Sequence, residues 1–416
     1  MIKSLISRKY RIPILTFLIG ALLMFVFLRT DNPLRMYLYN IKDEHDIMTR
    51  FAMMDTLANQ KATVKKFLSN DFQFTFDSKI YNKTTRKTGG LIMQDNKLLV
   101  FEQADIFKIW KTYDLDTVLP NIEPAVDENG GVYGGARKVF EFKNNLFCFL
   151  TLKEKNGNCF FASIVNLTLK KEVFRAPCIP DYKQLDFNEV GGGYTEYNDS
   201  LLFALGAPST YGKMTRDLIQ NINSPYGKIL LFTKEQLIEG RISKSSFEVF
   251  SIGHRNIQGL LNLNNEIFAV EHGPRGGDEI NLIERNKNYG WPIVSLGLTY
   301  EFENVYLPVG DSTKYTLPLF SFLPSAAISD IIDCPEIIKK RYYPLESFIV
   351  SSLRGESLYI VLFTKQNHRV ISVEKIDTHM RLRQFCKNSK DQLIVSTDDH
   401  GVYEITVNTL LNVLQK

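Results

Sequence analysis

The amino-acid sequence predicts an all-β protein, a six-bladed β-propeller that follows an N-terminal transmembrane helix and a helical stalk. Two observations predict this organisation. One is an uncharged, apolar run near the start of the chain, and the other is a polar turn followed by an apolar strand, which recurs six times across the rest of it. Repeats of several strands are typical of propeller blades, and a chain of 416 residues is long enough for such a ring.

Residues 12–28 form the uncharged apolar run, and four basic residues precede it within the first 11 positions. The run is about the shortest that crosses a bilayer. No small-residue cleavage pattern follows it, so we expect an uncleaved signal anchor rather than a secretory signal peptide. The basic cluster places residues 1–11 in the cytoplasm by the positive-inside rule. The bulk of the chain is therefore expected outside the cytoplasm, in the periplasm or at the cell surface.

Residues 29–70 are predicted to form the helical stalk. The segment from 34 to 68 contains neither Gly nor Pro and is rich in residues that suit a helix. From residue 71 onward, short β-type runs broken by Asn, Asp and Gly replace this pattern. We therefore expect the propeller to span residues 71–416.

The repeated pattern sets the number of blades. One blade cannot bury both of its faces alone, so six similar units are expected to close into a ring. The spacing widens after the third and fourth copies, which predicts long insertions there, and long loops are where binding sites are usually found. The copies lie at residues 95–101, 144–149, 198–203, 264–270, 345–350 and 390–395.

Composition excludes several classes of function. The formal net charge of +4 and the absence of a basic block interleaved with aromatic residues beyond the first dozen positions argue against a nucleic-acid partner. No two of the five cysteines form a CxxC pair, so a zinc site is not expected. Cys148 and Cys159 flank a turn, and they either pair across a hairpin or remain buried free thiols.

Residues 251–292 hold the most informative pattern, two loops rich in Arg, Asn, His, Gly and acids with a strand between them. Arg255 and Asn256 can hold a planar, anionic ligand through forked hydrogen bonds. Carbonyl oxygens of a Gly-Pro pair and nearby carboxylates are ligands that Ca²⁺ takes. The alternative is that His254 and Asn256 only fix the backbone of a loop.

Together these strings resemble the glucose/sorbosone and aldose sugar dehydrogenase family that depends on pyrroloquinoline quinone (PQQ). That family reads GHRNPQGL, E-H/Q-GP, DEINLI and NYGWP. Here the strings are GHRNIQGL from Gly253, EHGP from Glu271, DEINLI from Asp278 and NYGWP from Asn288. A weaker resemblance extends over residues 89–405 and implies a six-bladed propeller, in agreement with the repeat count.

The resemblance also implies two cofactors, PQQ on one face of the propeller and a Ca²⁺ ion beside it. Arg255 and Asn256 would contact the quinone ring system, and the arginines would complement the three carboxylates of PQQ. Arg354 lies where the family often has a Lys, and Arg381 and Arg383 match its RxR pair. The residues that would hold PQQ are Arg255, Asn256, His272, Arg354, Arg381 and Arg383.

For calcium, the resemblance implies the carbonyl oxygens of Gly273 and Pro274 as ligands. Asp278 and Glu279 follow closely in the sequence. They either hold a second, structural calcium ion or are ordinary turn carboxylates.

The catalytic base of the family is a His, and Glu189 stands in its place. The Asp that orients this His is also replaced, by Ala207. A buried Glu can act as a general base when burial raises its pKa toward the working pH. The alternative is that base and orienting residue were lost together because proton abstraction no longer matters.

These observations predict a membrane-anchored, extracytoplasmic, quinoprotein-like sugar dehydrogenase. It would oxidise an aldose or related alcohol with PQQ as hydride acceptor and pass electrons to an unidentified acceptor. The alternative is a catalytically inactive propeller that binds a glycan, a quinone or a protein partner. The retained arginines and the Gly-Pro pair favour the enzyme.

Overall fold

The structure is a computed structural model, and the predicted tail, membrane segment and stalk up to residue 63 lie outside the residues that it describes. All described residues belong to one compact unit, Thr63–Lys416. None of the helices in the described ranges is long and apolar enough to cross a membrane. The described residues are 64–78, 88–94, 97–102, 106–125, 135–155, 159–180, 189–208, 213–239, 243–298, 312–398 and 401–414.

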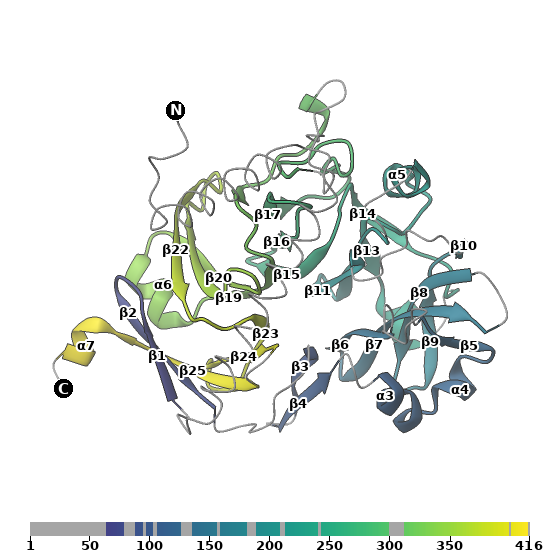
Figure 1. Ribbon diagram of the computed structural model, residues 1–416, viewed down its shortest axis with the longest axis horizontal. Helices are drawn as coiled ribbons and strands as arrows, with labels where there is room; N and C mark the ends of the chain where they lie inside the picture. Colours follow the sequence, from purple (N-terminus) through teal and green to yellow (C-terminus); the bar gives the residue numbers. More distant parts are fainter. Residues whose placement is uncertain are drawn as a thin grey trace, which may run out of the picture. The chain divides into compact units, whose positions relative to one another are not determined.

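The described strands form six antiparallel sheets (Figure 1). The smallest consists of β3 (Thr88–Gln94) and β4 (Lys97–Glu102). The second consists of β5 (Ile122–Pro124), β6 (Gly135–Phe142), β7 (Asn145–Glu154), β8 (Cys159–Asn166), β9 (Lys171–Arg175) and β10 (Ile179–Pro180). The third consists of β11 (Gly191–Tyr197), β12 (Ser200–Leu205), β13 (Lys228–Phe232) and β14 (Glu248–Ile252).

The remaining sheets follow in chain order. The fourth consists of β15 (Ile257–Leu263), β16 (Glu266–Glu271), β17 (Asp278–Ile283) and β18 (Phe320–Phe322). The fifth consists of β19 (Ile328–Asp333), β20 (Glu346–Ser352), β21 (Ser357–Phe363) and β22 (Val370–Asp377). The sixth combines β23 (Leu382–Lys387), β24 (Leu393–Thr397) and β25 (Val402–Thr409) with β2 (Phe72–Asp77) and β1 (Val64–Leu68).

Short helical segments lie in the connections. They are α3 (Ile106–Thr112), α4 (Leu115–Val118), α5 (Lys213–Gln220), the π-helical η3 (Glu235–Glu239), the 3₁₀ segment η4 (Ser312–Lys314), α6 (Glu336–Tyr342) and α7 (Leu410–Leu414).

The first main strand of each sheet faces a common centre. β3, β6, β11, β15, β19 and β23 contact one another in this order, and β23 returns to β3, so the ring of inner strands is closed (Figure 1). An all-β, propeller-like fold is therefore confirmed.

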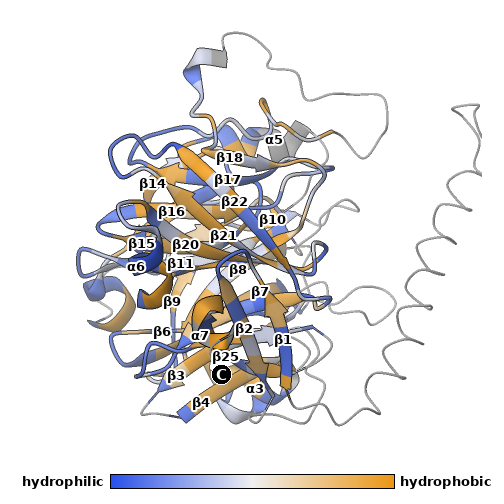
Figure 2. Ribbon diagram, turned by 90° about the vertical axis from the view of Figure 1, so that its left-hand side faces the viewer, coloured by the Kyte–Doolittle hydropathy of each residue, from blue (hydrophilic) through white to orange (hydrophobic). Residues whose placement is uncertain are grey.

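Each pair of neighbouring sheets shares one apolar cluster. For example, the Phe residues of β6 and β7 pack against Phe203 and Leu230 of the next sheet, and Phe268 packs against Phe348 of its neighbour. Middle strands are consequently buried on both faces, and β13 and β21 are buried along their entire lengths. Most strands are hydrophobic and many connecting turns hydrophilic (Figure 2). Burial on both faces explains why these strands read as apolar runs without alternation.

The six predicted repeats fall on β4, β7, β12, β16, β20 and β24, each in a different sheet. In three of them the polar pair before the strand adopts positive φ at both residues, as at Asn198 (47°) and Asp199 (64°). Two-residue turns that join strands need this conformation, which Asn and Asp tolerate well. The polar pair therefore marks the hairpin between the first and second strands of a blade.

The two ends of the described chain close the ring together. β2 pairs with β25 along its whole length, from Phe72 opposite Thr409 to Asp77 opposite Glu404, and β1 pairs with β2. The predicted stalk boundary is therefore wrong for its last residues, because Val64–Leu68 is a strand of the sixth sheet. Local helix propensity there is overridden because β1 pairs with β2, and β2 in turn pairs with β25, more than 300 residues away in sequence.

Phe74 of β2 tests this closure, because it is fully buried against the fifth and sixth sheets. We expect Phe74→Leu to lower the free energy of unfolding by about 1–3 kcal/mol, because the smaller side chain leaves buried volume unfilled in a packed core. Chemical denaturation would measure the change. Leu68→Ala, at a side chain that is 62% exposed on β1, should have little effect. Equal stability of wild type and Phe74→Leu would contradict a contribution of β2 to the stability of the fold.

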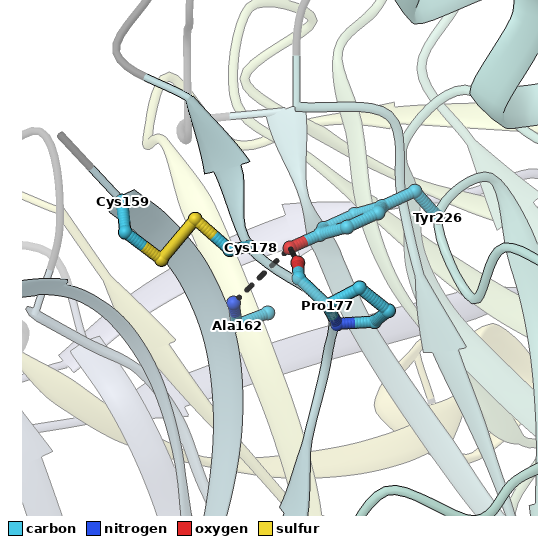
Figure 3. Close-up of a disulfide and its surroundings, with 5 residues drawn as sticks. All are labelled: Cys159, Ala162, Pro177, Cys178 and Tyr226. Atoms are coloured by element: carbon cyan, nitrogen blue, oxygen red, sulfur yellow. Dashed lines mark hydrogen bonds between the residues drawn. A yellow bond between two sulfur atoms is a disulfide. The ribbon is translucent and has the colours of Figure 1, made fainter.

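The disulfide in the structure joins Cys159 to Cys178, with 5.3 Å between their Cα atoms (Figure 3). For Cys159, both predicted alternatives are wrong, since it neither pairs with Cys148 nor remains a free thiol. Cys148 is a buried free thiol. The register explains this, since Cys148 lies opposite Val165, far along the β7–β8 ladder from Cys159. The bridge connects β8 to β10 instead, where Ile179 pairs with Phe160.

Removal of the bridge by Cys159→Ser with Cys178→Ser is expected to cost about 2–4 kcal/mol of unfolding free energy. Nearby, the Tyr226 hydroxyl donates to Pro177 O at 3.2 Å and accepts from Ala162 N at 3.4 Å (Figure 3). A reducing agent should lower the unfolding midpoint of wild type and leave that of the double variant unchanged. A wild-type midpoint that does not respond to reduction would contradict a stabilising bridge.

Candidate active site

The loop His254–Asn256, between β14 and β15, is fixed by the buried carboxylate of Glu271 at the end of β16. Glu271 Oε1 accepts from the backbone N–H of Arg255 and, at 3.2 Å, from that of Asn256. Glu271 Oε2 lies 3.2 Å from His254 Nδ1, and His254 Nε2 lies 2.8 Å from Ser251 Oγ. A carboxylate only accepts hydrogen bonds, so His254 donates from Nδ1. One carboxylate thus orients three consecutive residues.

Arg255 is the centre of the site. Its Nη2 donates to Glu189 Oε1, its Nη1 donates to the backbone oxygen of His272 at 3.2 Å, and its guanidinium lies 5.5 Å from the centre of the Trp291 ring. The Arg255 side chain is 4% exposed. Its Nε is buried with no hydrogen-bond partner among the described residues. A buried donor of this kind is costly unless an acceptor satisfies it, so Arg255 is suited to hold a further acceptor group.

Glu189 precedes β11 and is brought to Arg255 by close backbone packing. A Cβ at Gly206 would overlap the carbonyl oxygen of Glu189, so only Gly allows the two segments to approach in this way. The side chain of Glu189 is 14% exposed. Its ion pair with a guanidinium favours the ionised carboxylate, which opposes the effect of burial that the sequence suggested. The contact with Arg255 therefore holds the Glu189 carboxylate in one orientation.

Ala207 is fully buried and belongs to an apolar cluster with Ile219 of α5 and Trp291. Helix α5 is further tied to this wall because Gln220 Nε2 donates to Trp291 O at 2.6 Å and Asn288 Nδ2 donates to Gln220 Oε1 at 2.8 Å. The environment of Ala207 is thus apolar where the sequence comparison implied an orienting Asp. In this chain Arg255, rather than an Asp, orients the group at the position of the base.

Asn256 connects the loop to its neighbours. Its Oδ1 accepts from Gly191 N at 3.1 Å and from Gln258 Nε2 at 2.7 Å, and its Nδ2 lies 3.5 Å from His272 Nδ1. Burial lowers the pKa of His272, opposed in part by the charge of Asp278 and assisted by that of Arg255. His272 is therefore neutral at neutral pH and provides polar but uncharged contacts.

The predicted calcium ligands lie on the loop between β16 and β17 and at the start of β17. Asp278 accepts from Gly273 N at 3.0 Å, Ala327 N at 2.6 Å and Ser325 Oγ at 2.7 Å. These bonds fit the ordinary role of a carboxylate that ties loops together. Within the described ranges, no group of three or more His, Cys, Asp or Glu is arranged to hold a metal. The calcium assignment therefore stays a prediction that depends on backbone carbonyls.

Glu279 lies opposite Glu271 on the neighbouring strand. Burial, together with the charge of Glu271, raises the pKa of Glu279 to about 8, although a hydrogen bond from Asn281 acts in the other direction. Glu279 is thus mostly protonated at pH 7, so only a cation close to it would keep it ionised.

The three other arginines predicted to hold PQQ lie in two different places. Arg383 donates from Nε and Nη2 to the two carboxylate oxygens of Asp398, the latter at 2.8 Å, and Arg381 Nε lies 3.4 Å from Asp398 Oδ2. Arg354 is exposed in the β20–β21 turn, where Gly355 N donates to Ala326 O at 2.8 Å. The structure therefore links Glu189, Arg255, Asn256 and His272 through hydrogen bonds, whereas Gly273 is bonded to Asp278. It holds Arg381 and Arg383 as a separate pair.

A comparison with known sequences decides the family. The sequence profile of the glucose/sorbosone dehydrogenases matches residues 86–404 of the 416. The chain belongs to the glucose/sorbosone dehydrogenase family. As a glucose/sorbosone dehydrogenase family member it resembles curated proteins over short segments. An aldose sugar dehydrogenase of Escherichia coli is 34% identical over 122 residues, which cover 27% of this chain and 33% of that protein. Quinoprotein glucose dehydrogenase B of Acinetobacter calcoaceticus is 48% identical over 48 residues, 11% of this chain and 10% of that protein. The match thus spans a third or less of either relative.

Solved structures agree on the fold of this glucose/sorbosone dehydrogenase family member. The apo form of the soluble E. coli aldose sugar dehydrogenase superposes with a TM-score of 0.58 at 19% identity, over 83% of this chain and 99% of that one. The PQQ-bound aldose sugar dehydrogenase of Streptomyces coelicolor gives a TM-score of 0.52 at 18% identity, over 83% and 98%. At these identities the likeness establishes the fold.

Sequence reasoning gave no role to four side chains that shape the site. Glu271, Trp291 and Gln258 stand inside the strings that carry the family resemblance, and Asp398 lies near the end of the chain, 15 residues after Arg383. Membership of these strings was the signal that could have found the first three. The partners of Glu271, however, lie 15 to 17 residues away in the sequence, and Arg383 and Asp398 are 15 residues apart.

Proposed function

We propose that this chain is a membrane-anchored, extracytoplasmic sugar dehydrogenase that oxidises an aldose or a related alcohol and uses PQQ with Ca²⁺. The observation that carries the proposal is the buried Arg255–Glu189 pair. In this pair a carboxylate that could accept a proton lies beside a guanidinium whose buried Nε has no partner among the described residues. The names of the relatives support the same class of substrate.

The residues present fit PQQ in their chemistry. PQQ is planar and carries carboxylates, and guanidinium groups bind carboxylates through paired hydrogen bonds. Arg255 offers its buried Nε, Arg354 is exposed, and the Arg381 side chain is 36% exposed. Asn256 and Arg383 would add donors at the edge. When bound, PQQ would supply a quinone that accepts a hydride, which carries the two electrons of the oxidation.

Glu189 would perform the proton transfer. Its carboxylate would take the proton from the C1 hydroxyl of the sugar, and Arg255 would keep the carboxylate ionised and aimed before the reaction. Trp291 would cover the guanidinium, whose charge is then less screened by water. The carbonyl oxygens of Gly273 and Pro274 would hold the calcium ion, and Asp278 would set the shape of that loop.

The membrane segment at residues 12–28 would fix the propeller outside the cytoplasm. The Cys159–Cys178 bridge supports an oxidising compartment, because disulfides rarely persist in the cytosol. The electron acceptor would then be a soluble or membrane-bound carrier on that side.

A second candidate is a catalytically inactive propeller that binds a glycan, a quinone or a protein partner. The apolar surroundings of Ala207 favour it, because no Asp supports a base there.

The test uses the full-length chain in detergent, incubated with PQQ and CaCl₂ and then mixed with a panel of aldoses and an artificial dye. The enzyme proposal predicts dye reduction that depends on aldose, on PQQ and on Ca²⁺. PQQ binding without reduction for any aldose would favour the inactive propeller. Reduction that persists without PQQ would overturn the cofactor assignment.

A further inference from the structure

The inner strands of all six sheets line a cavity on the axis of the ring, with a volume of about 210 Å³. Neither Arg255 nor Glu189 lines this cavity. Each inner strand contributes at least one residue to its wall, namely Leu91, Lys138, Tyr194, Gln258, Asp330 and Gln384.

Lys138 is the unusual member of this wall. It is only 8% exposed, and among the described residues nothing forms a hydrogen bond or an ion pair within 4.0 Å with its ammonium. The Tyr194 ring lies next to it, and the centre of this ring is 5.6 Å from Lys138 Nζ. Burial lowers the pKa of Lys138, and the charge of Arg383 acts in the same direction, while Asp330 opposes both. An ammonium group carries three donors, and leaving them unsatisfied in the interior is costly.

Asp330 does not satisfy Lys138 by direct contact. Its Oδ1 accepts from Ile331 N at 3.0 Å, and its Oδ2 accepts from Phe385 N at 2.8 Å. Both oxygens are therefore held by backbone donors of β19 and β23, and these two donors offset part of the negative charge. Asp330 adds a favourable charge at a distance, but it leaves the donors of Lys138 available to a ligand in the cavity.

Gln384 adds an unsatisfied acceptor to the same wall. Its Oε1 is buried with no hydrogen-bond partner in the described part of the chain. Gln258 differs, because its amide already donates to Asn256 Oδ1 at 2.7 Å. A ligand suited to this cavity must therefore accept hydrogen bonds from Lys138 and donate one to Gln384. Water does both, but an anion gains far more from a buried cation than water does.

We propose that the axial cavity is a binding site for a small oxyanion that also carries a hydroxyl group, a phosphate monoanion or a small hydroxycarboxylate. Its charged oxygens accept from the ammonium of Lys138, and its hydroxyl donates to Gln384 Oε1. The site does not depend on the proposed sugar oxidation, since none of the residues assigned to that reaction lines the cavity.

Isothermal titration of the full-length chain with inorganic phosphate, glycolate and acetate tests the proposal. We expect saturable binding of phosphate and glycolate, and weaker binding of acetate, which has no hydroxyl to donate. Lys138→Met should weaken phosphate and glycolate at least about tenfold, the loss of one charge-assisted hydrogen bond. Lys138→Arg should retain binding. Lys375→Met serves as the control, because that lysine lies at the surface with Asp377 and does not line the cavity.

Gln384→Met provides a second, independent arm, which remains informative if Lys138→Met does not fold. It should abolish the preference for glycolate over acetate while leaving acetate binding unchanged. PQQ with Ca²⁺ should not displace glycolate. Three results would overturn the proposal: no saturable binding to wild type, equal affinity in folded Lys138→Met, or competition between PQQ and glycolate, which would move the anion to the cofactor face.

Discussion

Replacement of Glu189 by Gln is expected to reduce aldose-dependent dye reduction by about 10²- to 10⁴-fold, the usual contribution of a positioned general base. The Gln side chain keeps the size of Glu and can still accept the hydrogen bond from Arg255 Nη2 through its amide oxygen. It cannot take up the proton of the sugar hydroxyl. The loss should therefore fall on kcat, with PQQ binding retained.

The matched control is Glu248→Gln. Glu248 also pairs with an arginine, Arg285, but it is 53% exposed and lies on the outer strand β14. This variant should keep full activity. Wild-type activity in Glu189→Gln would contradict a base at this position and would require another proton acceptor in the site.

Replacement of Glu271 by Ala is expected to lower the free energy of unfolding by about 3–5 kcal/mol, the cost of breaking a buried, charged network. The carboxylate is buried and receives the backbone N–H groups of Arg255 and Asn256 as well as His254 Nδ1. All three donors would lose their acceptor at once. The loop that positions the Arg255–Glu189 pair should also lose its fixed conformation, so activity should fall together with stability.

Urea denaturation measures the change in the free energy of unfolding. Glu248→Ala provides the comparison with an exposed carboxylate. Exposed ion pairs contribute about 0–1 kcal/mol, so the control should be nearly as stable as wild type. If Glu271→Ala were no less stable than Glu248→Ala, the clamp on the loop would not be a significant part of the fold.

The repeats and the strand pattern predicted the propeller because the relevant signals are local. Each polar turn, such as Asn264-Asn265 before β16, needs only its own backbone conformation to mark a hairpin. Burial on both faces likewise leaves a local trace in continuous apolar strands such as β21. These signals place one strand in every sheet.

Features that depend on distant partners could not be predicted in this way. β2 pairs with β25 across almost the whole chain, and β1 joins the same sheet by pairing with β2. Nothing in the sequence near β2 identifies β25 as its partner. The Cys159–Cys178 bridge depends on the register of β8 and β10. Ala207 was identified as a departure from the family pattern, but its apolar contacts with α5 became visible only in the fold.

The candidate site shows the same division. Arg255, Asn256 and His272 were chosen from strings in the sequence, and the structure joins them through hydrogen bonds. The pairing of Arg255 with Glu189, 66 residues apart, was not foreseen. Arg354 remains apart, in an exposed turn.

The proposed binding of PQQ at this site can be tested by a titration of the full-length chain with PQQ. The absorbance of PQQ would be followed with CaCl₂ and, separately, with a calcium chelator. We expect saturable binding at one PQQ per chain, and we expect this binding to need Ca²⁺. Arg255→Met should weaken PQQ binding at least about tenfold, because it removes a paired guanidinium contact. Saturation that is equal in wild type and Arg255→Met, or no binding by folded wild-type protein, would contradict the proposed binding.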